Sequence, residues 1–363
     1  MHPEVDLVVI NNTRIPTTGG DYVYAVMKSE LIRKGYKIFE ASMPMIVNSI
    51  KTQCLANRLG HIFSWSAEPL AYLACYISSI KKIMRGSRLI ITSSCPTFPV
   101  FGHLTYHQPK AGMFTPFRRQ SNSLKRKIGY KMEENEMLSP GWFFAKKLLK
   151  LHLSNSDFTR QTTKKIYGVD SNVLYPPVPV HKYIRTNRRN KRKPSVLIAR
   201  PEATTGISLL PEIARNSPKS VKFVIIGNID QVGIRTLRAL KDMGTKFDYL
   251  GYVKEELKIE IFHKCSMYVN LAINEPFGIT VIEALAAGCI PIAHNSGGIP
   301  EYLPEELRYS DANEACEKIA TYLSSKDRPK GLRNIALRFE EANFRRKFMF
   351  FVQRLETLLK QKS

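Results

Sequence analysis

Residues 270–303 constrain the fold of this chain more than any other stretch. Pro276 and Gly278 interrupt regular structure, and residues 280–287 (TVIEALAA) then combine strong helix formers with apolar residues at helical spacing. The glycine that follows suits a left-handed helix cap, and residues 289–293 form a short apolar run typical of a buried parallel strand. The sequence therefore predicts a loop, helix, turn and strand from an α/β protein.

Two glutamates flank this predicted helix start. Glu275 lies in the loop and Glu283 lies in the helix, so both side chains can face one cleft at the helix N-terminus. Backbone N–H groups at such a terminus attract phosphate, and a second glycine loop follows the strand. Taken singly, each glutamate is more simply a surface or helix carboxylate.

Taken together, the motif Glu-x7-Glu with Pro-Phe-Gly between its glutamates, followed by Gly-Gly-x-x-Glu, resembles the donor site of retaining GT-B glycosyltransferases of family 4. The resemblance implies that Glu275 contacts the sugar and Glu283 the ribose hydroxyls of a nucleotide sugar, GDP-mannose or a UDP-sugar. The donor-binding backbone implied by the motif comprises Phe277, Gly278, Ile279, Thr280, Gly297 and Gly298.

Predicted strands and helices alternate along the whole chain, which indicates parallel sheets with crossover helices. We expect a GT-B fold, in which two Rossmann-like, doubly wound domains face each other across a cleft. The predicted parts are an acceptor-side domain (1–178), a basic linker (179–194), a nucleotide-sugar-binding domain (195–340) and a C-terminal helix returning toward the first domain (341–363).

Three further positions follow predicted strands. Gly19 and Gly20 form a turn that is not G-x-G-x-x-G, so we expect no dinucleotide cofactor; alone they suit a tight turn, and the resemblance places them near the donor. A lone histidine is more often structural, but the family pattern places His107 near the donor sugar. Arg200 ends the first strand of the second domain, where the family clamps the diphosphate.

The chain departs from the family pattern at Thr205, where family members have a second cationic clamp, a lysine. Arg200 can still bind phosphate bidentately, with one positive charge fewer at the leaving group. With Glu275 and His107 it forms the predicted catalytic set. No Asp-x-Asp motif occurs in the sequence, so we expect no metal and no cofactor beyond the donor.

Basic residues outnumber acidic residues by 55 to 31, and residues 110–193 hold 20 of the former and 5 of the latter. This asymmetry suits an anionic membrane surface, or RNA, and the simplest alternative is an ordinary amphipathic helix with solvated lysines. The predicted membrane or acceptor face comprises Arg118, Arg119, Lys125, Arg126, Lys127, Trp142 and Phe143.

Residues 155–178 (N-S-x-F-T through V-L-Y-P-P-V) resemble mannosyltransferases that extend dolichol-linked oligosaccharides. This implies transfer of a hexose, preferably mannose, to a polyprenyl-linked or dolichyl-linked glycan by a protein peripheral on the cytoplasmic face of a membrane. Six cysteines without metal-ligand spacing, and no apolar run of signal-peptide or spanning length, agree with a reducing compartment. The alternatives are a soluble sugar or protein acceptor and, since no binding module for nucleic acid is recognisable, more remotely a basic nucleic-acid-binding protein.

Overall fold

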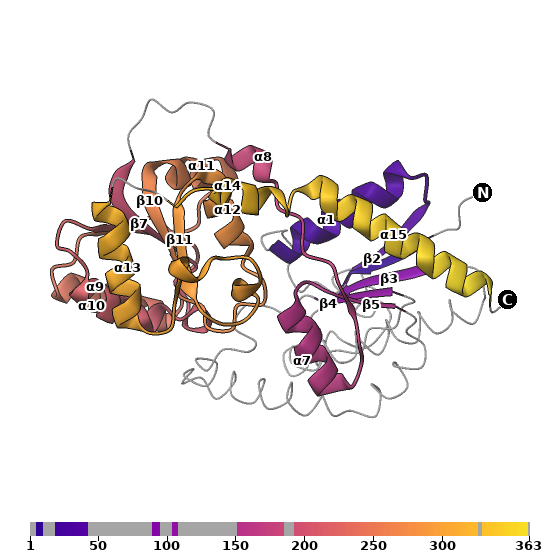
Figure 1. Cartoon of the computed structure of the whole chain (residues 1–363), viewed down its shortest axis with the longest axis horizontal. Coiled ribbons are helices and arrows are strands. Elements are labelled where there is room, and N and C mark those ends of the chain that lie inside the picture. The colour runs from indigo at the N-terminus through magenta and orange to yellow at the C-terminus, as the bar shows by residue number, and fades with distance from the viewer. Residues whose placement is uncertain are drawn as a thin grey trace, which may run out of the picture. The chain divides into compact units, whose positions relative to one another are not determined.

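The computed structural model describes residues 5–9, 19–42, 89–94, 104–107, 151–184, 192–325 and 329–361. These residues belong to two compact units (Figure 1). The first unit holds the described residues up to Pro177 and those from Phe344 onward, and the second runs from Val178 to Asn343. In the part of the chain that the structure describes, none of the helices combines the length and the apolar character needed to cross a membrane.

The first unit contains a parallel sheet whose described strands follow the order β2-β1-β3-β4-β5-β6. This is the doubly wound order of flavodoxin-like sheets, which reverses between the first and third strands. The strands are β1 (Val5–Val9), β2 (Ile38–Ser42), β3 (Leu89–Ser94), β4 (Leu104–His107), β5 (Leu151–Ser154) and β6 (Asn172–Val173).

The helices described in the first unit are α1 (Gly19–Arg33), α7 (Asp157–Tyr167) and α15 (Glu341–Lys360). Ser156 caps helix α7, because its hydroxyl accepts a hydrogen bond from the Thr159 amide at 3.0 Å. Gly19 and Gly20, expected to form a turn before the helix, are the first two residues of helix α1, and Asp21 lies in its first turn.

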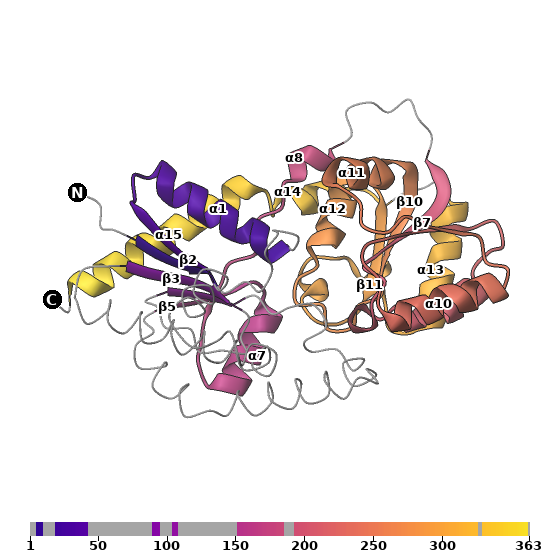
Figure 2. The ribbon, with the colours of Figure 1, turned by 180° about the vertical axis from the view of Figure 1, so that it is seen from behind.

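Helix α15 completes the core of the first unit. Its Phe344, Phe348 and Val352 are buried with side chains of α1 and the sheet, and α15 lies beside α1 in both views (Figure 1, Figure 2). The buried Glu30 carboxylate of α1 lies 3.4 Å from the guanidinium of Arg345. The chain end is thus tied to a helix near the chain start.

The second unit contains a parallel sheet whose described strands follow the order β12-β11-β10-β7-β8-β9. Counted within the unit, this is the Rossmann order, and it reverses between β7 and β10. The strands are β7 (Lys193–Ala199), β8 (Lys222–Ile226), β9 (Phe247–Tyr249), β10 (Cys265–Asn270), β11 (Ile290–His294) and β12 (Arg308–Tyr309).

Helix α12 (Ile279–Ala287) is the predicted helix of the opening motif and is buried along almost its whole length. It packs against α8, α11 and α14, and Gly288 caps it with a left-handed φ of 70°, as predicted. The other helices described in this unit are α8 (Val180–Tyr183), α9 (Leu210–Asn216), α10 (Gln231–Asp242), α11 (Glu255–Lys264), α13 (Ala312–Ser324) and α14 (Leu332–Leu337), with 3-10 turns η2 (Ala203–Thr205), η3 (Ile207–Leu209), η4 (Ile299–Glu301) and η5 (Glu305–Leu307).

The segment expected to be a basic linker contributes to the second unit. It supplies α8, and β7 begins at Lys193 rather than at residue 195. The Arg192 guanidinium donates hydrogen bonds to the carbonyl oxygens of Phe262 at 2.6 Å and of Ala287. Arg192 therefore satisfies backbone acceptors near the C-terminal ends of α11 and α12, a role that charge patterning alone does not indicate.

Candidate functional site

Arg200 and Glu275 meet where the strand order of the second sheet reverses. Arg200 directly follows β7, Glu275 follows β10, and these two strands are paired neighbours. Ligands of doubly wound sheets bind at the carboxyl ends of the strands at such a point. The Nη2 atom of Arg200 lies 3.3 Å from Oε2 of Glu275, and the two side chains are 46% and 8% exposed. The guanidinium is thus accessible to an anion, whereas the carboxylate is buried beside it.

Backbone strain occurs at Arg200 and at the residue before Glu275. Among the described residues, the non-glycine residues with positive φ are Arg200 and Asn274, each at 57°. An L-residue in the left-handed region costs about 1–2 kcal/mol. Such strain gathers at functional sites when the surrounding structure enforces it.

The turn after β7 is held by Thr205, the residue at the family's lysine position. Its buried hydroxyl donates to the carbonyl oxygens of Arg200 and Glu202, the latter at 2.9 Å. A Cβ atom at Gly233 would lie 2.1 Å from the Pro201 carbonyl oxygen. The start of α10 therefore needs a glycine at this position to pack against the turn. Thr205 therefore shapes the turn that presents Arg200.

The Gly-Gly loop holds the backbone of Glu275. The amide of Gly298 donates to the Glu275 carbonyl oxygen at 2.8 Å, and a Cβ atom at Gly297 would lie 2.2 Å from the same oxygen. The Asn274 amide donates to the Ser296 hydroxyl at 2.8 Å. The Gly-Gly loop therefore fixes the backbone position of Glu275, and the Gly298 amide is already bonded within the protein.

The N-terminus of α12 completes this side of the site. Gly278 has a φ of 90°, and a Cβ atom there would lie 2.9 Å from the Tyr302 hydroxyl. That hydroxyl donates to the Phe277 carbonyl oxygen at 2.7 Å, which fixes the entry of the chain into the helix. Ile279 and Thr280 lie in the first helical turn, whose amides have no acceptor within the helix and favour a negative charge.

Glu283 is buried within α12 and is held by residues from two other helices. The Tyr183 hydroxyl of α8 donates to Oε1 of Glu283 at 3.0 Å. The Lys258 ammonium of α11 lies 2.6 Å from Oε2. The second carboxylate of the motif is thus oriented and charge-balanced by this chain's own side chains.

The charges of both glutamates act on the hydroxyl of Tyr268, which lies on β10. Burial raises the pKa of its hydroxyl, Glu275 and Glu283 raise it further, and Arg200 partly opposes them. The pKa of Tyr302 is also raised, by burial and then by Glu275. Both phenols therefore stay neutral near pH 7.

The remaining predicted site residues lie in the first unit or outside the described residues. Gly19 and Gly20 begin α1, and His107 ends β4. The residues of the predicted membrane or acceptor face lie outside the described residues: Arg118, Arg119, Lys125, Arg126, Lys127, Trp142 and Phe143.

Sequence reasoning missed Tyr183, Lys258, Tyr268 and Tyr302. Tyr183 is separated from its partner Glu283 by 100 positions, so no local spacing connects the two. The signal available for Tyr268 is its place among apolar residues, because a tyrosine in a buried strand requires a polar partner for its hydroxyl.

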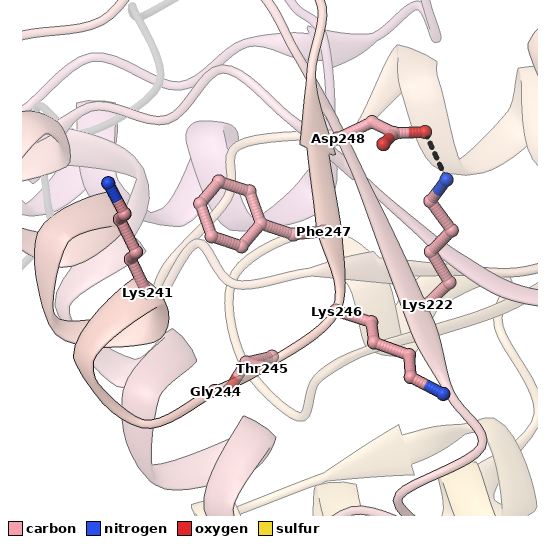
Figure 3. Close-up of a pocket in the computed structure, with 7 residues that line it drawn as sticks. All are labelled: Lys222, Lys241, Gly244, Thr245, Lys246, Phe247 and Asp248. Atoms are coloured by element: carbon pink, nitrogen blue, oxygen red, sulfur yellow. Dashed lines mark ion pairs between the residues drawn. The ribbon is translucent and has the colours of Figure 1, made fainter.

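A surface pocket lies elsewhere in the second unit, at the β9 edge of the sheet (Figure 3). Its lining includes Lys241 of α10, Lys222 of β8 and Lys246 just before β9, and Lys222 pairs with Asp248 at 2.5 Å between β8 and β9. None of the predicted site residues lines it. In the described ranges there is also no cluster of three or more His, Cys, Asp or Glu suited to a metal ion.

The comparisons with known proteins agree with this geometry. Residues 183–339 match the family model of glycosyl transferases group 1, a range that contains Arg200, Glu275, Glu283 and the Gly-Gly loop. The chain is 26% identical over 242 residues to the GDP-Man:Man(3)GlcNAc(2)-PP-Dol alpha-1,2-mannosyltransferase of Dictyostelium discoideum, a match that covers 57% of this chain and 47% of that protein. The chain thus spans about half the length of this curated relative.

Solved structures match nearly the full chain at low identity. Sucrose-phosphate synthase of Thermosynechococcus elongatus has a TM-score of 0.67 at 14% identity, covering 98% of this chain and 100% of that chain. Anabaena HepE in complex with UDP and glucose has a TM-score of 0.60 at 12% identity, covering 97% and 100%. At this identity the matches establish the fold, which is that of GT-B glycosyltransferases. Residues 183–339 are therefore similar to the group 1 glycosyltransferases, in a chain that has the GT-B fold and distant similarity to the mannosyltransferases of dolichol-linked oligosaccharides.

Proposed function

We propose that this protein is a retaining glycosyltransferase that moves a hexose, preferably mannose, from a nucleotide sugar to a lipid-linked glycan. The observation that carries the proposal is the Arg200–Glu275 pair at the reversal of the Rossmann sheet, with Glu283 on the adjoining helix. A cation and two buried carboxylates at this point suit a donor with a diphosphate and two hydroxyl-rich sugars.

The reaction breaks the bond between the anomeric carbon of the donor and its diphosphate. Arg200 and the first-turn amides of α12 offset the negative charge that develops on the leaving group. A phosphate oxygen of the departing diphosphate accepts the proton of the acceptor hydroxyl, whose oxygen bonds the anomeric carbon on the same face. Charge balance at the diphosphate comes from these groups, so we expect the reaction to need no metal.

The glutamates align the donor. Glu275 accepts hydrogen bonds from the hexose hydroxyls, and Glu283 accepts them from the ribose hydroxyls. Neither serves as an acid or base of the kind that glycosidases use. The resemblance to the family also assigns His107, at the end of β4, and Gly19 and Gly20, at the start of α1, to the donor-binding residues.

GDP-mannose is the preferred donor and a UDP-sugar the alternative. The name of the Dictyostelium relative specifies a GDP-mannose donor and a dolichyl-linked acceptor. The HepE structure contains UDP, so a protein with this fold binds a uridine nucleotide. The acceptor proposed here is accordingly a polyprenyl-linked or dolichyl-linked glycan, met at the cytoplasmic face of an anionic membrane through the basic segment 110–193.

The donor is tested with a thermal-shift series of GDP-mannose, UDP-glucose and UDP-N-acetylglucosamine, followed by turnover. The key variant is Glu275→Gln, which keeps the size of the side chain and should reduce transfer at least about 100-fold. Glu260→Gln is the matched control, because Glu260 pairs with Lys264 on the surface of α11. Stabilisation by none of these donors would refute the proposal.

The acceptor is tested separately by giving the active protein a polyprenyl-diphosphate glycan or a soluble oligosaccharide. Flotation with vesicles containing phosphatidylserine should be strong at low salt and fade as salt rises. Replacing Arg118, Arg119, Lys125, Arg126 and Lys127 with serine should weaken flotation and leave donor binding unchanged. Efficient transfer to the soluble sugar, with no flotation, would replace the lipid acceptor with the soluble one.

A further inference from the structure

We propose that Tyr183 and Lys258 are positioning residues that hold the Glu283 carboxylate ready for a vicinal diol, and so set the preference of this protein for ribonucleotide over 2′-deoxyribonucleotide donors. This rests on the proposed function, in which Glu283 meets the ribose hydroxyls. Tyr183, Lys258 and Glu283 all belong to the second unit, and the interatomic distances of the structure define their contacts.

The hydroxyl of Tyr183 has little freedom to move. The residue is 1% exposed, and its ring packs edge-on against Phe262 with 5.9 Å between centroids. Its carbonyl oxygen lies 2.8 Å from the Nε2 atom of His263, which ties α8 to α11. A hydroxyl fixed in this way at 3.0 Å from Oε1 determines the rotation of the Glu283 carboxylate.

Lys258 holds the other oxygen of the carboxylate. Its ammonium lies 2.6 Å from Oε2 of Glu283 and 5.8 Å from the centre of the Tyr183 ring. The lysine side chain is 26% exposed, whereas that of Glu283 is 7% exposed. Lys258 therefore pairs by charge with a buried carboxylate and is the more exposed partner of the two.

Acceptor capacity remains on the carboxylate after both contacts. An ionised carboxylate offers roughly four lone-pair sites, of which the Tyr183 hydroxyl occupies one on Oε1, whereas Lys258 pairs with Oε2 by charge and forms no hydrogen bond with it. Two hydroxyls on neighbouring carbons fit the remaining capacity, one to each oxygen. A ribose presents such a pair, and a 2′-deoxyribose lacks one member of it.

The test measures a ratio of affinities by calorimetry. The probes are GDP and 2′-deoxy-GDP, with UDP and 2′-deoxy-UDP as the second pair. The wild-type protein should bind the ribonucleotide about 10-fold or more tightly than its deoxy counterpart, the worth of a hydrogen bond to a charged group. Glu283→Gln should bring this ratio close to one.

Tyr183→Phe and Lys258→Met should each lower the ratio at least about 3-fold, mainly by weakening ribonucleotide binding. Lys258→Arg keeps the charge and should recover part of the ratio. The matched controls are Tyr309→Phe, which removes a buried hydroxyl bonded to the Asn270 carbonyl oxygen, and Lys264→Met, which removes a surface lysine of the same helix. A merely structural loss would weaken both nucleotides equally and leave the ratio unchanged.

The failures are distinguishable. If the wild type binds none of the four nucleotides at millimolar concentration, the proposed function fails and this inference fails with it. If it binds a ribonucleotide and Glu283→Gln collapses the ratio, but Tyr183→Phe and Lys258→Met keep the wild-type ratio, only the positioning role is refuted. If ribonucleotide and deoxyribonucleotide bind equally to the wild type, Glu283 does not recognise the two ribose hydroxyls. This inference is then overturned, whereas donor binding still stands. Should Tyr183→Phe not fold, as judged by circular dichroism, the two Lys258 variants decide.

Discussion

Replacing Gly297 with alanine isolates the effect of moving Glu275 without altering its side chain. The added Cβ atom would lie 2.2 Å from the Glu275 carbonyl oxygen and 2.7 Å from its amide nitrogen. These are backbone atoms that cannot rotate away. The loop that carries Glu275 must therefore shift.

The magnitude follows from the geometry. Real Cβ atoms essentially never approach closer than 3.0 Å, so the 2.2 Å contact requires the loop to move by most of an ångström. Misplacing a group at a reacting centre by about 1 Å can cost about 100-fold in rate. The φ of 69° at Gly297 adds strain of about 1–2 kcal/mol for an alanine, which lowers stability independently of the clash.

Gly244→Ala provides the matched control, since Gly244 has a φ of 67° and nothing within 4 Å of an added Cβ atom. Both variants should lose a similar amount of stability from backbone strain, measured by chemical denaturation. Only Gly297→Ala should also lose about 100-fold in kcat/KM. Equal kcat/KM values for the two variants would refute the idea that the Gly-Gly loop acts by placing Glu275.

Arg200→Ala should raise the donor dissociation constant at least about 10-fold, because it removes a charge-assisted contact to the diphosphate; unchanged binding by calorimetry would contradict the placement of Arg200. Thr205→Lys restores the family's lysine but deletes the hydrogen bonds that shape the turn, so we expect a lower melting temperature and no gain in donor affinity; tighter binding with an unchanged melt would be the opposite result. Glu30→Gln should destabilise the first unit at neutral pH, because hydrogen bonding and charge from Arg33 lower the pKa of this buried carboxyl. That stabilisation is complete above the unfolded pKa of about 4.3 and is lost as pH falls through the lower folded pKa, so the denaturation midpoints of variant and wild type should converge in acid.

Local signals in the sequence were sufficient for the opening motif of the second unit. The glycine cap of α12, the buried strand after it and the two glutamates of the motif are all readable, because propensity and periodicity act over a few residues. The serine cap of α7 is readable for the same reason, since its hydroxyl bonds an amide three positions later. Parallel sheets followed from the alternation of these elements.

The roles of individual polar residues were decided by tertiary structure. Thr205, read from the sequence as a missing cation, is a buried hydroxyl that closes the turn below Arg200. Arg192, read as linker charge, satisfies carbonyl groups of two helices. The partner atoms of Arg192 lie on helices that are distant in the sequence and meet it only after folding. The partner atoms of Thr205 lie within a turn whose shape the composition does not specify.

The trio around Glu283 shows the same division. The spacing of the motif placed a carboxylate at the helix, and only the fold brought α8 and α11 against it, from positions 100 residues and 25 residues away. Backbone preferences are local and can be read in order along the chain, whereas hydrogen bonds and charge pairs depend on which side chains come within about 3 Å after folding. The sequence alone therefore determined which elements form and which motif they carry, and the tertiary structure decided which side chains hold that motif in place.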